Sequence, residues 1–586
     1  MSGRGVAARP PLDLPEGDSH QGQVQPLAEL DVLIVDCQTT GASPAFGAVL
    51  ELAWGVVRAD QEELRELESH FIALPDGHSV PQQVIRLTGY DPARSASAIS
   101  DAEAWRRMRR AVHDAAPVPT AIHYARFELS FLREWAARLQ PDAEFPLDAV
   151  CVHAVARRLF PTLPRQSLRA LAGFLGHSLD LTRSSRGHVE ATAFVWRKLC
   201  GELAARGIET WPRLRAWLLE PAAAPARTKK PSYPLAKSRY KTLPNEPGVY
   251  RFLRSNGDVL YVGKATSLSK RTASHFSARA GTQQAPEMLT QVSDIQVTVV
   301  ASALEAALLE HETIRALRPP YNVQLTTSDA RVWYSTRSFD AACPAPDERH
   351  SLGPLPSEYS LRALGAQASL VSGSPPSQRL RAEAVGVSGL WTPDEPVFAA
   401  GFALYAKRHE LESGTREARR RVLDAAKLLL RARALGKVED DTLIGEASEE
   451  AKSRQWDPER VARHLERAAA QAYQVYRRAR WLRLLSDCEI IYREPESSRT
   501  RRLQLQNGEL REASDAAPNF APSAHPGRAP ATPSACVFDR TIYDRLRILS
   551  TELKRVQRDG GSLQIYVGRA RRAIPAARLA GIQRVV

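Results

Sequence analysis

The chain has 586 residues, which at roughly 100–200 residues per domain predicts about three to five domains. Its formal net charge is +14, from 80 Lys and Arg against 66 Asp and Glu, and so basic a chain favours a polyanionic partner such as nucleic acid. The sequence holds no apolar run of the roughly 18 residues that a membrane helix needs, which argues against a membrane span. None of its six cysteines forms a CxxC pair, which argues against a zinc ribbon and a disulfide framework.

The N-terminal half begins with a leader and an α/β domain. Residues 1–28 lack the apolar core of a signal peptide and are predicted to be disordered. Residues 29–205 alternate short apolar strands with helical stretches, which is typical of an α/β domain. Strands are expected over 31–36 and 49–57, and helices over 169–175 and 190–199. Residues 206–240 are predicted to be a linker, because they turn Pro/Ala-rich and then basic.

Residues 241–326 predict a small sheet with helices. Gly248–Leu253 and Val259–Val262 are apolar strands around an Asn-Gly turn, which indicates a hairpin. Residues 295–300 supply a third strand and 303–317 a helix that carries Glu305, Glu310 and Glu312. The segment thus offers two tyrosines, Lys, Arg and a helix-borne carboxylate. Phosphodiester hydrolysis needs these chemical types to activate water, hold a cation and bind the phosphate.

The C-terminal half is harder to interpret. Residues 327–410 show no regular pattern, whereas 411–486 are helical, with a helix over 416–435 and a second one starting at Asp457-Pro458. The arginines of that second helix fit either a phosphate-facing surface or an ordinary solvated face. Residues 487–586 are predicted to hold a small β hairpin with an Asn507-Gly508 turn, a disordered stretch over 512–535 and a last helix over 541–558.

The motifs of residues 241–326 resemble the GIY-YIG nuclease domain of the excinuclease subunit UvrC and its shorter relative Cho. The resemblance rests on Gly248-Val249-Tyr250, on Tyr261-Val262-Gly263-Lys264 and on Pro320-Tyr321-Asn322. It implies that Tyr250 orients or deprotonates the attacking water, that Tyr261 supports the water and the phosphate, and that Arg271 holds the scissile phosphate. Spacing alone leaves Glu305 and Glu310 as alternatives for the metal ligand. The resemblance assigns that role to Glu310.

The resemblance also assigns the remaining members of the site. Lys264, or the metal, is expected to lower the pKa of the Tyr250 phenol, which is otherwise near 10. His275 stands where UvrC-type domains often carry a tyrosine, and its role as a base or as an acid for the leaving group stays open. Gly263 and Asn322 are expected to contact the substrate.

The upstream domain resembles the DnaQ-like (DEDDh) 3′–5′ exonucleases. The motif Asp36-Cys37-Gln38-Thr39-Thr40-Gly41 is similar to their D-x-E-T-T-G signature, and similarity continues through residues 50–52, 87–89, 123–128 and 167–171. The implied fold is RNase H-like. Four carboxylates and a histidine are needed for that chemistry. Here Gln38 replaces one acid, Glu128 replaces an aspartate, and Arg183 and His188 occupy the last motif. In either possible register a ligand is missing, so the domain is predicted to be catalytically inactive.

The two resemblances together indicate a bacterial fusion of a DnaQ-like exonuclease domain with a GIY-YIG endonuclease domain. The expected fold class is therefore multidomain α/β and α+β, ending in a mainly helical region with a small β element. The implied function is a single incision in DNA that depends on Mg²⁺ or Mn²⁺, as in the 3′ cut of nucleotide excision repair. The resemblance further implies a cytoplasmic, nucleoid-associated nuclease that a UvrA/UvrB-type complex recruits. A 3′–5′ exonuclease and a non-catalytic nucleic-acid-binding scaffold are the alternatives.

Overall fold

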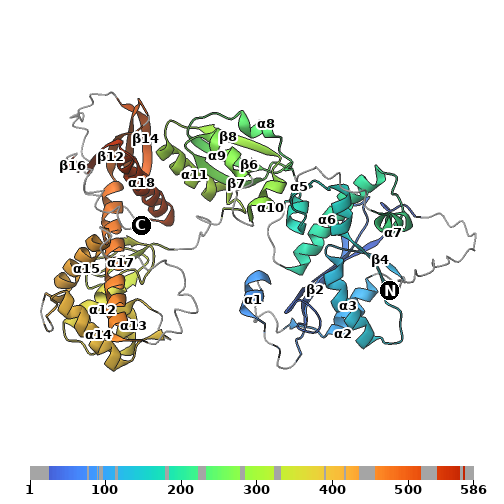
Figure 1. Cartoon of the computed structure of the whole chain (residues 1–586), viewed down its shortest axis with the longest axis horizontal. Coiled ribbons are helices and arrows are strands. Elements are labelled where there is room, and N and C mark those ends of the chain that lie inside the picture. The colour runs from blue at the N-terminus through green and yellow to red at the C-terminus, as the bar shows by residue number, and fades with distance from the viewer. Residues whose placement is uncertain are drawn as a thin grey trace, which may run out of the picture.

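The computed structural model describes residues 25–574 except for several internal segments. The residues outside the description are 1–24, 76–77, 79, 89, 91–96, 112–116, 179–183, 222–231, 278–283, 323–330, 388–390, 413, 415–416, 435–455, 496, 517–537, 568–571 and 575–586. Most of the predicted leader, the Pro/Ala-rich part of the linker, Arg183 and most of the predicted disordered stretch fall among them. Three lobes are visible in Figure 1, with the domain of residues 241–322 between the N-terminal domain and the C-terminal half.

The N-terminal domain is built on a five-stranded sheet of order β3-β2-β1-β4-β5, in which β1 is antiparallel to β2 and parallel to β4. This is the RNase H-like arrangement that was predicted. Side chains of β1 alternate between two cores, because Val32 and Ile34 pack with α6 while Leu33 and Val35 pack with α2 and α3. The elements are β1 (Val32–Thr39), β2 (Val49–Val57), β3 (Leu64–Phe71), α1 (Gln82–Thr88), α2 (Asp101–Arg110), β4 (Val118–Ile122), α3 (Ala125–Leu139), β5 (Leu147–Cys151), α4 (Val152–Leu159), α5 (Leu168–Phe174), α6 (Ser185–Ala204) and α7 (Trp211–Leu219).

The second domain is a three-stranded antiparallel sheet of order β7-β6-β8 with helices around it. The strands and the long helix match the predicted ones closely. Ser302 and Ser267 cap two of the helices with their side-chain oxygens, as expected for serine at that position. The elements are α8 (Lys237–Lys241), β6 (Gly248–Leu253), β7 (Val259–Ala265), α9 (Leu268–His275), α10 (Gln284–Gln291), β8 (Asp294–Val299) and α11 (Ala303–Leu317).

A helical region follows, on a small sheet of order β10-β9-β11. Its core is formed by the apolar faces of α12, α14, α15 and α17. Asp457 caps α17 by accepting the N–H of Arg460, as the Asp-Pro signature predicted. Helices in the described part of the chain lack the combination of length and apolarity that would let them cross a bilayer. The elements are β9 (Trp333–Ser335), β10 (Ala342–Cys343), β11 (Leu352–Leu355), α12 (Arg362–Val371), α13 (Gln378–Val385), α14 (Glu395–Arg408), α15 (Ala418–Ala434) and α17 (Pro458–Leu485).

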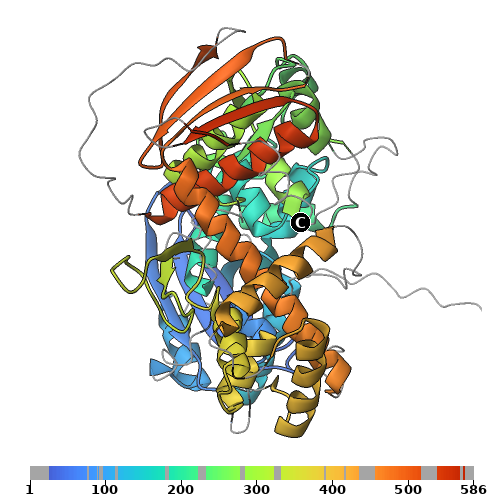
Figure 2. The ribbon, with the colours of Figure 1, turned by 90° about the vertical axis from the view of Figure 1, so that its left-hand side faces the viewer.

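The C-terminal region holds a larger β element than the predicted hairpin. Its five-stranded antiparallel sheet has the order β14-β13-β12-β15-β16, and α18 packs against it (Figure 2). Residues 512–516, predicted to be disordered, continue a strand, because the Asn507-Gly508 turn with positive φ at both residues pairs them with β13. The elements are β12 (Cys488–Arg493), β13 (Thr500–Gln506), β14 (Glu509–Ala516), α18 (Arg540–Arg558), β15 (Ser562–Val567) and β16 (Arg572–Ile574).

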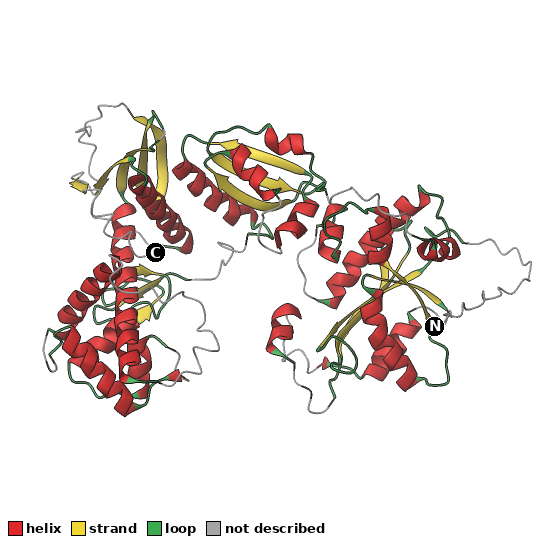
Figure 3. Ribbon diagram, viewed as in Figure 1, coloured by secondary structure: helices red, strands yellow, loops and turns green. Residues whose placement is uncertain are grey.

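Helices join the second domain to its neighbours on both sides (Figure 3). On one side α10 packs on α5 of the N-terminal domain, and Glu287 accepts a hydrogen bond from the Ser167 hydroxyl at 2.9 Å. On the other side α11 packs on α18, and Leu304 and Leu308 of α11 belong to the same core as the C-terminal sheet. The second domain is therefore held between the two by direct side-chain contacts.

Candidate active site

The two motif tyrosines stand on the paired strands β6 and β7. Tyr250 is opposite Gly263 in the register, and its ring lies over that glycine. A Cβ atom at Gly263 would lie 2.4 Å from the Tyr250 hydroxyl oxygen and 2.9 Å from a ring carbon of Tyr261. Only glycine therefore leaves room for both rings at this point, which explains why the second motif ends in glycine.

The Tyr250 hydroxyl oxygen lies 2.7 Å from His275 Nε2. Burial, and then the neighbouring Tyr261, raise the pKa of the Tyr250 phenol well above its ordinary range, and Arg271 offsets this only in part. Burial and the positive charge of Arg271 lower the pKa of His275 to about 4. The imidazole is therefore neutral at neutral pH, and its Nε2 can accept a hydrogen bond from the phenol hydroxyl.

Glu310 and Glu305, the two alternatives for the metal ligand, have different surroundings. Glu310 Oε1 accepts the backbone N–H of Lys264 at 2.8 Å and the side chain lines a cavity. Glu305 instead forms a 2.8 Å ion pair with Arg501 of the C-terminal sheet. Burial raises the pKa of Glu310, and Glu552 adds to this, while the N–H and the charge of Lys264 act in the opposite direction. A buried carboxylate of this kind gains from a nearby cation.

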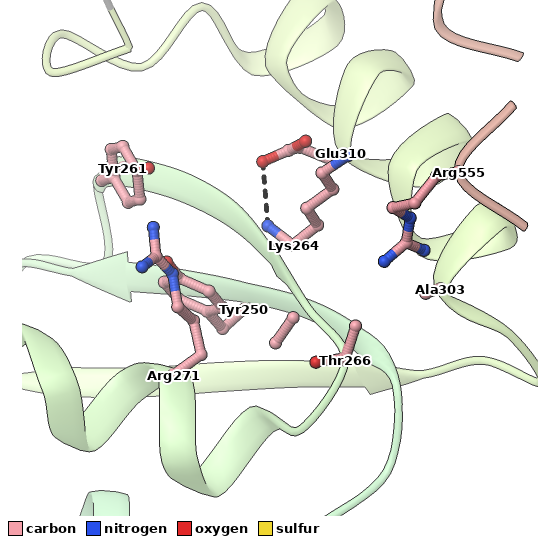
Figure 4. Close-up of a pocket in the computed structure, with 9 residues that line it drawn as sticks. Tyr250, Tyr261, Lys264, Thr266, Arg271, Ala303, Glu310 and Arg555 are labelled. Atoms are coloured by element: carbon pink, nitrogen blue, oxygen red, sulfur yellow. Dashed lines mark hydrogen bonds between the residues drawn. The ribbon is translucent and has the colours of Figure 1, made fainter. Parts of the chain in front are cut away.

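A cavity of about 330 Å³ brings these groups together (Figure 4). Arg271 reaches into it from α9 beside Tyr250, and Glu310 comes from α11 on the opposite wall. The Lys264 ammonium forms an ion pair with Glu552 of α18. Of the two cations expected to lower the pKa of Tyr250, Lys264 is paired with Glu552 instead, and Arg271 takes its place beside the phenol. The lining residues are Tyr250, Tyr261, Lys264, Ala265, Thr266, Arg271, Ala303, Glu310 and Arg555.

Asn322 lies at the outer edge of the sheet, beside β7. Its side-chain oxygen accepts the N–H of Val262 at 2.9 Å, and its side-chain nitrogen donates to the carbonyl of Val262 at 2.9 Å. The amide thus pairs with the edge strand as a further strand would. In this position Asn322 holds β7, and with it Tyr261, in place.

Residues 246–323 match the family model of the UvrC-like GIY-YIG domain. The chain contains a UvrC-like GIY-YIG domain. A Mycobacterium tuberculosis protein named a bifunctional exonuclease/endonuclease is 29% identical over 311 residues, which cover 50% of this chain and 45% of that protein. The UvrABC system protein C of Alkalilimnicola ehrlichii is 46% identical over 97 residues, 17% of this chain and 16% of that protein. The chain thus spans less than half the length of these relatives.

Two solved structures are also similar to parts of the chain. The GIY-YIG N-terminal endonuclease domain of UvrC from Thermotoga maritima, bound to magnesium, is 34% identical and covers 15% of this chain and 93% of that one, with a TM-score of 0.14. A full-length 3′-exonuclease is 13% identical and covers 31% of this chain and 84% of that one, with a TM-score of 0.26. The family match and the curated relatives confirm the predicted nuclease-type domain and the exonuclease-like region before it.

Replacing Gly263 with alanine is expected to disable the GIY-YIG site without unfolding the domain. The new methyl group would collide with the Tyr250 hydroxyl and push it from His275. A displacement of about 1 Å at reacting groups can cost about 100-fold in rate. The loss is measured by plasmid nicking. Another glycine of the domain, Gly257, is unsuitable for a control substitution, because its positive φ would strain an alanine. Ala265→Gly, on the same strand, is the matched control, and an equal loss in both variants would contradict the steric explanation.

The exonuclease-like site brings together four of its predicted members, Asp36, Gln38, Glu128 and His188. His188 Nδ1, near the start of α6, lies 3.3 Å from Asp36 Oδ1 on β1, and Gln38 follows on the same strand. Burial lowers the pKa of His188, but the bond to Asp36 and the charges of Asp36 and Glu51 outweigh it and the net direction is upward. Burial and the charge of Asp36 raise the pKa of Glu128 to about 8. Clustered carboxylates raise one another's pKa in this way whenever no cation lies between them.

Glu51 is an acid of this site that the sequence reasoning did not single out. It lies opposite Gln38 on the neighbouring strand, and only 6% of its surface is exposed. Its carboxylate accepts the Ser69 hydroxyl at 2.8 Å and the Ser185 N–H at 3.0 Å, so it holds the N-terminus of α6. The Leu50-Glu51-Leu52 pattern placed it on a strand but could not show this partner.

Proposed function

We propose that this chain is a metal-dependent DNA endonuclease that makes a single-strand incision at its GIY-YIG site. The observation that carries the proposal is the cavity that joins Tyr250, Arg271 and Glu310, three groups from three elements of the domain. A cation ligand, a phosphate-binding guanidinium and a water-orienting phenol are the parts that hydrolysis of a phosphodiester requires. The relatives named UvrABC system protein C support the proposal.

The attacking water would be oriented by Tyr250. The phenol transfers its proton to His275 as it takes one from the water, so that a phenolate is never required in the buried site. Arg271 neutralises charge on the phosphate oxygens, and Tyr261 provides a second hydroxyl beside them. His275 is thereby assigned as a base, and Gly263 and Asn322 act by positioning the two tyrosine-bearing strands.

Glu310 would hold the divalent cation, Mg²⁺ or Mn²⁺. The residues fit such an ion, because the carboxylate is buried, its pKa is raised and it faces a cavity lined by the hydroxyl-bearing Tyr250 and Tyr261. A hydrated Mg²⁺ bound through one carboxylate keeps several waters, which suits a site with a single acidic ligand. When bound, the ion supplies Lewis-acid stabilisation of the negative charge that develops on the phosphate.

The upstream domain would serve as a catalytically inactive DNA-binding or docking module. The support is Gln38, which stands where the exonuclease motif has an acid, and the contact of His188 with the retained Asp36. The incision itself would be the 3′ cut of nucleotide excision repair, made on DNA in the cytoplasmic nucleoid and delivered by a UvrA/UvrB-type complex. That part rests on the likeness to UvrC and Cho.

Metal removal tests the proposed function. Wild-type protein with Mg²⁺ or Mn²⁺ is expected to convert supercoiled plasmid to the open-circular form, and EDTA is expected to abolish this conversion. Adding back Mg²⁺ or Mn²⁺ restores it, because the chelator leaves the fold intact. Nicking at an unchanged rate in EDTA would contradict a metal-dependent site, and the absence of nicking with both metals on plasmid and on lesion-containing duplex would contradict the endonuclease.

A further inference from the structure

Residues of the C-terminal sheet form hydrogen bonds with the N-terminus of α11, the helix that carries Glu310. Glu494, just after β12, accepts the N–H groups of Ala303 and Leu304 at the N-terminus of α11, both at 3.3 Å. The Tyr492 hydroxyl lies 2.7 Å from the Ser302 hydroxyl at the same end. A carboxylate at a helix N-terminus is favourable both for the unpaired N–H groups and for the helix dipole. The C-terminal domain therefore fixes one wall of the GIY-YIG cavity.

Helix α18 runs past the mouth of that cavity and brings two charged side chains to it. Glu552 is 5% exposed, and its carboxylate forms an ion pair with the Lys264 ammonium. Arg555, one turn further along, places its Nε 2.7 Å from Glu552 Oε2, close enough for an ion pair but not aligned as a hydrogen bond. Figure 4 shows the Arg555 guanidinium on the side of the cavity opposite Tyr261.

Arg555 stands where two cavities meet. The second one, of about 570 Å³, lies between the GIY-YIG domain and the C-terminal sheet, and it shares Thr266, Ala303 and Arg555 with the cavity of the tyrosines. The second cavity also contains acidic Glu494 and Asp559. Asp559 forms an ion pair with Arg558 at 2.8 Å. Glu494 accepts the N–H groups at the N-terminus of α11, and its Oε1 also lies 3.8 Å from Arg555 Nη2. A DNA strand that leaves the scissile phosphate through this second cavity would bring its next phosphate to Arg555.

We propose that Arg555 binds a DNA phosphate adjacent to the scissile one, so that the nuclease site is completed by the C-terminal domain. This inference rests on the proposed endonuclease function. Glu552 is a positioning residue in this scheme, since it holds Lys264 and Arg555 on the same side of the cavity. Arginine suits the role because its guanidinium forms directed, charge-assisted hydrogen bonds to phosphate oxygens.

The test compares Arg555→Ala with Arg547→Ala, a partly exposed arginine of the same helix that lines neither cavity. Steady-state nicking of a fluorescein-labelled duplex in Mg²⁺ gives kcat and KM, and the salt dependence of duplex binding in EDTA counts phosphate contacts. Arg555→Ala is expected to raise KM about 10-fold with little change in kcat, and to reduce the slope of log K against log salt by about 1. Arg547→Ala is expected to match wild type, and Arg555→Lys to recover most of the binding.

Two results would overturn the inference. One is a KM and a salt slope for Arg555→Ala equal to those of Arg547→Ala. The other is a lower melting temperature with reduced nicking at an unchanged salt slope, which assigns Arg555 a structural role only. The wild-type protein shows whether the Arg555 proposal alone has failed or the proposed endonuclease function has failed with it. A wild type that nicks DNA supports the endonuclease whichever way the Arg555 variants behave.

Discussion

Replacing Tyr250 with phenylalanine is expected to lower the rate of nicking by about 10²- to 10⁴-fold, the range typical of losing a general base. The phenyl ring keeps its packing among Phe252, Leu260 and Leu268, whereas the hydroxyl that contacts His275 is lost. Because one hydrogen bond contributes only about 1 kcal/mol net, the fold is expected to persist. Single-turnover nicking gives the chemical rate, and thermal unfolding reports the fold.

Tyr240→Phe provides the matched control for that experiment. Tyr240 lies on α8 in the same domain, is 7% exposed and stacks on Phe276, but it does not line the catalytic cavity. Its nicking rate is expected to equal that of wild type. A Tyr250→Phe variant as active as Tyr240→Phe would remove Tyr250 from the chemistry and leave it as a strand aromatic.

Truncating Leu304 to alanine is expected to destabilise the junction between the GIY-YIG and C-terminal domains by about 2–5 kcal/mol. This side chain is fully buried in the core that α11 shares with α18 and β12. The midpoint of the first thermal unfolding transition should fall, and nicking should fall with it, since the same helix carries Glu310. Leu308→Ala, one turn further on, is expected to have a similar effect.

Leu317→Ala tests whether that loss belongs to the interface. Leu317 ends the same helix but is 48% exposed, so its truncation is expected to change stability by less than about 0.5 kcal/mol. If the Leu304→Ala protein melts like the Leu317→Ala protein, the C-terminal domain does not stabilise α11, and the proposal that it completes the site weakens with it.

Local sequence signals were sufficient for most elements of the GIY-YIG domain. Gly248–Leu253 and residues 303–317 were predicted with the boundaries that the structure has, because turn residues and helix caps are encoded within a few positions. The contrast between Glu305 and Glu310 was not encoded in this way. It depends on Arg501, which is almost 200 residues away in the sequence and takes Glu305 into an ion pair.

The part of the site that the sequence could not predict comes from the C-terminal region. Nothing in the pattern of α18 separates Glu552 and Arg555 from its other charged residues, because a helix with arginines on its solvent side is common. Their position follows from tertiary packing of α18 on α11. Residues 512–516 of β14 were predicted to be disordered for a related reason. Their polar composition is unlike a strand by itself, and pairing with β13 determines their conformation.

The most direct measurement of the central claim is plasmid nicking in Mg²⁺ by three proteins side by side: wild type, Glu310→Ala and Asp36→Ala. Glu310 supplies the buried carboxylate of the GIY-YIG cavity, and Asp36 is the retained acid of the exonuclease-like site. We expect Glu310→Ala to abolish the open-circular product while leaving DNA binding intact, and Asp36→Ala to nick at the wild-type rate. Loss of activity in Asp36→Ala instead, with trimmed 3′ ends as the products, would contradict the account.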